Sequence, residues 1–215
     1  MKRKIIYFML IILILLTSTA SYGKEINNKL EKKIIVLDPG HGGKDRGTSV
    51  GDVYESKINL EISLKLKEEL TKYGVVALLT RDGDYDLSSP NVSRRKKSDF
   101  DNRIKLINNS NADLYLSIHI NYLSDSKYYG AQVFYVNDNL NLAKSIQKSL
   151  KEDLKSPLNE KKLGNEIYMY KKLNVPGVLI ECGFISNNKE RKLLIDEVYQ
   201  YKIVNSIIKG LINYY

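Results

Sequence analysis

The stretch Ile34-Ile35-Val36-Leu37-Asp38-Pro39-Gly40-His41-Gly42-Gly43 carries the strongest fold signal in the chain. Its short apolar run, rich in β-branched residues, predicts a buried strand. The glycines behind it allow a tight backbone turn where that strand ends. A helix is expected next at 55–73, where apolar residues recur every fourth position before Gly74 stops the helix. A buried strand followed by an amphipathic helix is typical of an α/β layered domain.

The rest of the chain repeats this alternation of strands and helices. Further strands are predicted at 75–80, 112–120, 131–136, 166–170 and 178–181, with a polar loop at 81–91. Further helices are predicted at 93–109 and 139–154, after a capping box formed by Asn187 and Glu190, and in a final segment that runs to the C-terminus. We therefore expect a single α/β domain with a mostly parallel or mixed central sheet and helices on both faces.

The N-terminus has the layout of an export signal. Three basic residues at 2–4 precede an unbroken apolar run at 5–16, and small or polar residues follow up to Gly23. The apolar run is shorter than the roughly 20 residues of a spanning helix. Residues 1–23 are therefore predicted to be a signal peptide or an N-terminal membrane anchor, and residues 24–215 to form the working domain outside the cytoplasm.

Composition excludes several classes of protein. The single cysteine, Cys182, rules out an intrachain disulfide. The net charge of +9 comes from a lysine-rich chain without the basic and aromatic pattern of nucleic-acid binding. The glycine-rich loop at 40–43 fits neither a phosphate loop nor a dinucleotide fingerprint, and no Gly-x-Ser-x-Gly motif is present. Cys182 could act as a nucleophile with His119, although a lone cysteine after a buried strand usually serves as a small apolar filler.

Chemically versatile side chains stand at the ends of several predicted strands. The chain has only two histidines: His41 follows one strand and His119 closes another, while Glu181 closes a third. Glu55 opens the first predicted helix. In open α/β sheets such strand ends converge on one site, and two imidazoles with one carboxylate suit a catalytic zinc ion. A second carboxylate could then move protons. The alternatives are hydrogen-bonded core histidines and a glutamate that only complements a helix dipole.

Taken together, these segments resemble the zinc-dependent N-acetylmuramoyl-L-alanine amidases of bacterial cell walls. The matching segments, which span most of 34–194, are 35–43, 55–57, 79–81, 113–121, 130–135 and 178–187. One departure is that Ser56 follows Glu55 where the family more commonly has lysine. The resemblance implies a mixed sheet flanked by helices, in agreement with the pattern of elements.

The resemblance also implies residue roles. His41, Glu55 and His119 would bind one zinc ion per chain, and Glu181 would be the catalytic glutamate. The substrate would be the amide that joins the lactyl group of N-acetylmuramic acid to the L-alanine of the stem peptide. Because both histidines would then be metal ligands, Glu181 would have to carry the proton. Asn121 and Arg81 are candidates for positioning the substrate, and hydrogen bonds within strand-end loops are the alternative for both.

A narrower resemblance is to the sporulation and germination amidase, which removes stem peptides so that muramic-δ-lactam can form in the spore cortex. It lies in segments 84–87, 94–97 and 126–132 and in the lack of wall-binding repeats. It implies peptidoglycan as substrate, an activating partner protein and a downstream deacetylase as candidate partners, and action in the cell wall or the forespore intermembrane space. Membrane contact would be limited to the N-terminal segment. The alternatives are a vegetative autolysin, a non-catalytic zinc-containing wall-binding module and a zinc peptidase.

Overall fold

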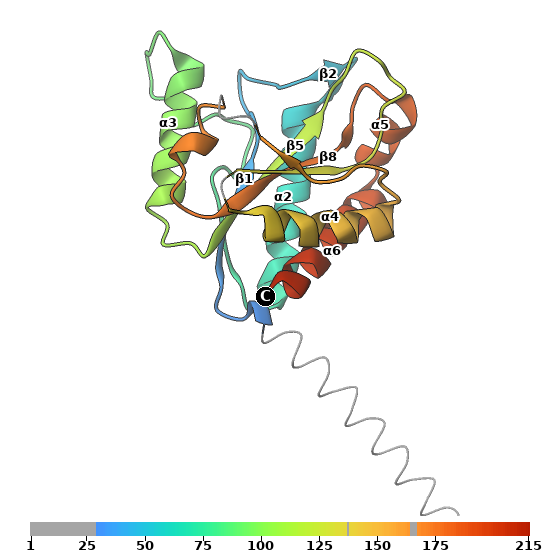
Figure 1. The fold of residues 1–215 in the computed structure, drawn as a ribbon. Helices are drawn as coiled ribbons and strands as arrows, with labels where there is room; N and C mark the ends of the chain where they lie inside the picture. Colours follow the sequence, from blue (N-terminus) through green and yellow to red (C-terminus); the bar gives the residue numbers. More distant parts are fainter. Residues whose placement is uncertain (1–28, 137, 164–166) are drawn as a thin grey trace, which may run out of the picture.

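The computed structural model describes residues 29–136, 138–163 and 167–215 (Figure 1). The signal peptide or anchor predicted at 1–23 lies outside these residues. Within the described ranges, no helix combines the length and the apolar character needed to cross a bilayer.

A mixed six-stranded sheet forms the centre of the domain. Four neighbouring strands run parallel, β6 is antiparallel to β8, and β7 is parallel to β6. In spatial order the strands are β4 (Val76–Leu79), β1 (Ile34–Pro39), β5 (Leu114–Asn121), β8 (Gly177–Phe184), β6 (Gln132–Tyr135) and β7 (Lys161–Lys162). A separate two-stranded hairpin, β2 (Ser49–Val50) and β3 (Val53–Tyr54), leads directly into the first long helix.

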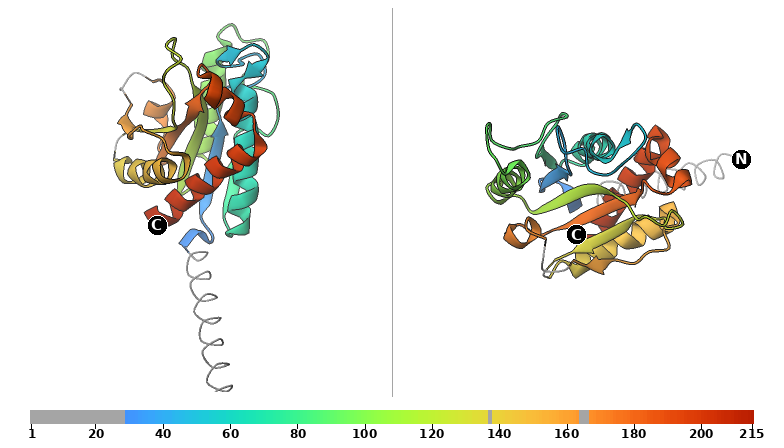
Figure 2. Two further views of the ribbon diagram at one scale, coloured as in Figure 1. Left: turned by 90° about the vertical axis from the view of Figure 1, so that its right-hand side faces the viewer. Right: turned by 90° about the horizontal axis from the view of Figure 1, so that it is seen from above.

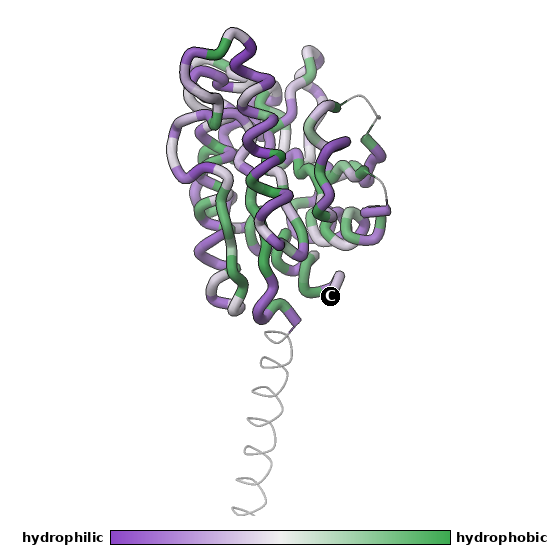
Figure 3. The backbone as a smooth tube through the Cα atoms, turned by 90° about the vertical axis from the view of Figure 1, so that its left-hand side faces the viewer, coloured by the Kyte–Doolittle hydropathy of each residue, from purple (hydrophilic) through white to green (hydrophobic). Residues whose placement is uncertain are grey.

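Helices cover both faces of the sheet, as predicted (Figures 1 and 2). One face packs against α2 (Glu55–Lys72), α4 (Leu140–Leu154) and α6 (Glu197–Tyr214). The other carries α3 (Arg95–Asn108) and the short 3-10 helix η1 (Tyr170–Lys172). Helix α5 (Asn188–Leu194) links β8 to α6. Strands buried on both faces need apolar residues at nearly every position. This explains why stretches of the backbone tube in Figure 3 are green, the colour of hydrophobic residues.

The two cores differ in size. On the α2 side, the predicted face of Ile58, Ile62, Leu66 and Leu70 is buried against β1 and β5. On the α3 side, a smaller cluster forms around Val36, Tyr115, Ile104, Ile107 and Leu179. Few apolar residues hold helix α3 in place. Its attachment to the sheet therefore depends more on polar contacts.

The strand predicted at 166–170 is wrong over the part that the structure describes. Residues 168–169 form a turn that leads into η1. Met169 and Tyr170 are both buried in the smaller core, whereas successive residues of a strand point to opposite faces. The short strands β2, β3 and β7 were not predicted, because two-residue strands carry no periodic pattern.

The predicted capping box is half right. Asn187 caps α5 by accepting hydrogen bonds from the backbone N–H groups of Lys189 and Glu190. The Glu190 carboxylate does not bond back to Asn187. It accepts the N–H groups of Gly130 (2.9 Å) and Phe184 (2.7 Å) instead, and so joins the β5–β6 loop to the end of β8.

A buried ion pair ties α3 to the sheet. Asp38, at the end of β1, accepts hydrogen bonds from Thr80 Oγ1 (2.7 Å), Ser117 Oγ (2.9 Å) and the Arg103 guanidinium (2.7 Å). The side chains of Asp38 and Arg103 are 1% and 2% exposed. Burial alone would raise the pKa of Asp38, but Arg103 holds that pKa below its ordinary value. A single carboxylate therefore joins β1, β4, β5 and α3.

Replacing Arg103 with Met would leave the Asp38 carboxylate buried without its cation. We expect the free energy of unfolding to fall by about 3–5 kcal/mol, measured by urea unfolding of the metal-free protein. Lys97→Met is the control: it removes an ion pair with Asp101 (2.6 Å) from the exposed side of the same helix. Exposed pairs contribute little, so the unfolding midpoint of this variant should barely move. Equal losses in the two variants would contradict the importance of the buried pair.

Candidate metal centre

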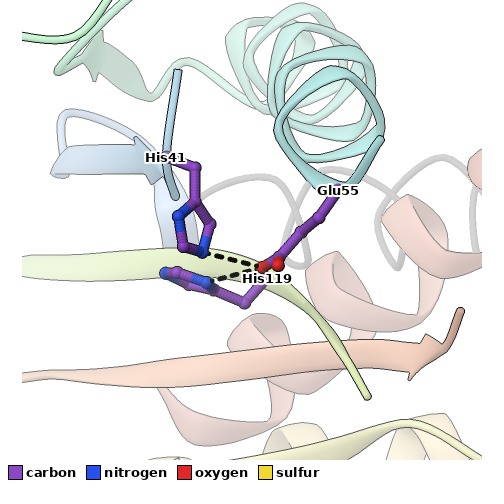
Figure 4. Close-up of side chains that lie close together, drawn as sticks. All are labelled: His41, Glu55 and His119. Atoms are coloured by element: carbon purple, nitrogen blue, oxygen red, sulfur yellow. Dashed lines mark hydrogen bonds and ion pairs between the residues drawn. The ribbon is translucent and has the colours of Figure 1, made fainter. Parts of the chain in front are cut away.

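Three of the residues selected from the sequence meet at one point (Figure 4). His41 follows β1, Glu55 is the first residue of α2, and His119 lies in β5. Glu55 Oε1 is 3.2 Å from His41 Nε2 and 2.9 Å from His119 Nδ1. Each residue offers one possible ligand atom, and these atoms lie within 4.8 Å of one another. The predicted convergence of these side chains is therefore present in the fold.

Glu55 is fixed on all sides. The β2–β3 hairpin brings the start of α2 back to the end of β1, where Glu55 Oε2 accepts hydrogen bonds from Thr48 N (2.9 Å) and Oγ1 (3.0 Å). Burial on its own would raise the pKa of Glu55, but hydrogen bonds and charge interactions with His119 and His41 hold it well below its usual range. The carboxylate is thus ionised and pointed at both imidazoles.

His41 is held through its ring and its backbone. It adopts φ +62°, in the left-handed region, and its carbonyl accepts a hydrogen bond from Arg103 (2.6 Å). Its Nδ1 lies 2.9 Å from Asp45 Oδ2. Burial lowers the pKa of His41, but Asp45 and Glu55 outweigh this and raise it to about 9. A carboxylate behind a ring nitrogen orients imidazole ligands in metal sites.

Asp45 was not among the residues selected from the sequence. The only local signal was an acidic residue four positions after a histidine in a glycine-rich loop, and such a residue is common in turns. Two glycines also shape the site. A Cβ at Gly40 would overlap the His119 ring, and one at Gly47 would lie 2.5 Å from Glu55 Oε2. At both positions the neighbouring atoms leave no room for a side chain, so only glycine fits.

Glu181 lies beside this group, on the neighbouring strand. Its Cα pairs with that of His119 across β5 and β8. Its Oε2 is buried and has no hydrogen-bond partner among the described residues. Burial and repulsion by Glu55 raise the pKa of Glu181 to about 8, against the opposing effect of His41. A carboxyl group with a shifted pKa and a free oxygen in a cleft is suited to proton transfer.

A cavity of about 190 Å³ opens onto these groups. His41, His119 and Glu181 form its polar end, together with Asp38, Gly40 and Arg103. The other residues that line it are mostly apolar: Phe100, Ile167, Met169, Tyr170 and Leu179. The site thus has room for a small ligand with both polar and apolar parts.

The two candidate positioning residues have different surroundings. Arg81 is 1% exposed and donates hydrogen bonds to four backbone carbonyls, those of Pro39, Gly40, Ser56 and Gly83. These bonds favour the alternative left open for Arg81, hydrogen bonds within the strand-end loops, because the side chain supports the loop that carries His41. Asn121 is half-buried at the end of β5, and its contact with substrate stays a prediction.

The alternative of a cysteine nucleophile does not fit the structure. Cys182 is fully buried in the larger core. Burial raises the pKa of its thiol, as do the nearby Glu181 and Glu190. A thiol that stays protonated and away from solvent is unreactive, so Cys182 is an apolar filler.

Comparisons with known proteins agree with this fold and site. Residues 35–213 match the family described as N-acetylmuramoyl-L-alanine amidase, Amidase_3. The germination-specific N-acetylmuramoyl-L-alanine amidase of Bacillus subtilis (strain 168) is 41% identical over 192 residues, covering 86% of this chain and 81% of that protein. The probable cell wall amidase LytH of Staphylococcus saprophyticus is 32% identical, over 86% of this chain and 60% of the relative.

A solved amidase structure is similar to this chain in both sequence and fold. The CwlD amidase of Clostridioides difficile, in complex with the GerS lipoprotein, is 44% identical, with a TM-score of 0.81 over 85% of this chain and 98% of that one. The resemblance predicted from the sequence, including its narrower form, is thereby confirmed. The chain belongs to the Amidase_3 family of N-acetylmuramoyl-L-alanine amidases, enzymes that act on the peptidoglycan of bacterial cell walls.

Proposed function

We propose that the chain cleaves the bond between the lactyl group of N-acetylmuramic acid and the L-alanine of the stem peptide with the help of one zinc ion held by His41, Glu55 and His119. The observation that carries the zinc assignment is the meeting of two imidazoles and a carboxylate from three separate elements. This donor set is that of catalytic zinc centres, in which one coordination position stays open. The free oxygen of Glu181 beside the set fits the same chemistry.

A zinc ion held by these three residues would supply Lewis-acid chemistry at the scissile carbonyl and would lower the pKa of a bound water molecule to about 7. Glu181 accepts a proton from the attacking water while the water oxygen forms a bond to the lactyl carbonyl carbon. Glu181 then gives that proton to the alanine nitrogen as the carbon–nitrogen bond breaks. The products are a muramic acid carboxylate and a free alanine amino group.

The other residues of the site hold these groups in place. Asp45 fixes the ring of His41, so that the nitrogen nearest Glu55 faces the metal position. Arg81 and Arg103 hold the backbone carbonyls around His41. Asn121, at the end of β5, is the residue to which we assign a contact with the substrate.

In the cell, we place the reaction in the spore cortex, where removal of stem peptides precedes formation of muramic-δ-lactam by a deacetylase. The similarity to a germination-specific amidase supports this role. The enzyme acts outside the cytoplasm, and residues 1–23 serve as its signal peptide or anchor. The similar amidase in complex with a lipoprotein supports a protein partner for this chain as well.

Product analysis tests the function directly. Digestion of purified peptidoglycan should release stem peptides with new L-alanine amino termini, as identified by mass spectrometry, and addition of a muramic acid deacetylase should yield δ-lactam. New termini within the stem peptide would indicate a zinc peptidase instead. Binding without any new termini would indicate a wall-binding module, and amidase products that never lead to δ-lactam would favour a vegetative autolysin.

Glu181→Gln keeps the shape of the side chain but removes its ability to accept a proton. We expect release of alanine amino groups to slow by about 10²–10⁴-fold, the usual contribution of general acid–base catalysis. Zinc content and the urea unfolding midpoint should match those of the wild-type protein. His119→Ala should instead lose zinc and activity together. Wild-type turnover in Glu181→Gln would contradict the proton-transfer role.

Two glycines offer a matched test of the metal position. Gly47 and Gly51 have similar φ values of +67° and +59°, so alanine costs comparable backbone strain at either position. A Cβ at Gly47 would lie 2.5 Å from Glu55 Oε2 and 2.8 Å from His41 Cδ2, whereas nothing lies within 4 Å of one at Gly51. Gly47→Ala should therefore weaken zinc binding by about 10-fold or more in a calorimetric titration. Equal affinities in Gly47→Ala and Gly51→Ala would contradict the proposed ligands.

A further inference from the structure

We infer that Met169 and Leu179 set the size of the residue that this enzyme accepts on the nitrogen side of the scissile amide. Together they form a buried wall of an apolar subsite that takes the methyl group of alanine. The inference rests on the proposed function, because it assumes that the amide is cleaved at the group of His41, Glu55, His119 and Glu181. The inference adds to that function the two residues that select the substrate.

The subsite is the apolar half of the cavity that opens onto the catalytic groups. Met169 is 3% exposed and Leu179 is 7% exposed, and both line the cavity. Phe100, from α3, lines the same cavity. Met169 and Leu179 belong to the smaller core, where they pack with residues such as Val36. A wall that is backed by packed side chains cannot easily move away from a larger ligand.

The position of Leu179 relative to Glu181 decides which part of the substrate enters. The two residues lie two positions apart on β8, so their side chains point to the same face of the sheet, roughly 7 Å apart along the strand. Glu181 gives its proton to the alanine nitrogen, so the alanine must lie next to Glu181. The methyl group on the adjoining carbon is then directed to the apolar wall. The bulky, hydrated sugar on the other side of the amide is left toward the open side.

The cavity is small. Its volume of about 190 Å³ lies below the roughly 300–1,000 Å³ of pockets that hold drug-sized ligands. A longer side chain that extends toward the apolar wall would press on Met169 or Leu179.

The test compares two synthetic muramoyl dipeptides that differ only in the first residue, L-alanine or L-norvaline. The wild-type enzyme should prefer the alanyl substrate in kcat/KM by about 10-fold or more, because norvaline carries two more methylenes than alanine and even one extra methylene in a tight apolar pocket has about that effect. Met169→Ala and Leu179→Ala, tested separately, should each narrow this preference by about 10-fold and raise the absolute rate on the norvalyl substrate. Loss of stability alone cannot produce a higher rate.

Leu173→Ala is the matched control. Leu173 is 7% exposed and belongs to the same smaller core, but it does not line the cavity. This variant should lose comparable stability and keep the wild-type preference. If Met169→Ala and Leu179→Ala also keep that preference, the inference is overturned while the proposed function stands. If the wild-type enzyme frees no amino group from the alanyl substrate, the proposed function itself fails.

Discussion

The ion pair between Asp38 and Arg103 is the interaction on which the geometry of the site depends. Burying two charges costs more free energy than their attraction returns unless further hydrogen bonds satisfy both groups, and here each group makes several. Asp38 accepts bonds from β4, β5 and α3. Arg103 reaches Asp99 and the carbonyls of Pro39 and His41. The pair therefore joins the end of β1 to β5 and to the residue after β4, and it holds the helix beside the cavity and the backbone of one candidate zinc ligand.

The charges of the site explain why a cation suits it. The carboxylates of Asp45, Glu55 and Glu181 lie around two imidazoles. The pKa values of Asp45 and Glu55 are held low, the former mainly by its close contact with the His41 imidazole and the latter by both histidines against the cost of burial. Burial and the repulsion by Glu55 raise the pKa of Glu181. A divalent cation between the imidazoles and Glu55 would offset this excess of negative charge and favour the ionised base.

Local sequence patterns predicted the parts of the fold that depend on periodicity and strand ends. The apolar run before His41, the helix face that begins at Ile58 and the convergence of strand ends could all be read from the sequence. The sequence did not indicate the direction of β6, the turn at Met169, the burial of Arg81 or the contact of Asp45 with His41. Each of these depends on which distant segments become neighbours, and a local pattern carries no such information.

The most direct test of the zinc centre is anomalous scattering at the zinc edge from crystals of the zinc-loaded protein. The proposal predicts one strong peak per chain, about 2.0–2.2 Å from a ring nitrogen of His41, a ring nitrogen of His119 and a carboxylate oxygen of Glu55. It also predicts that Glu181 lies beside the peak without binding it. A peak at other residues, or no peak in an active, zinc-loaded crystal, would contradict the assignment.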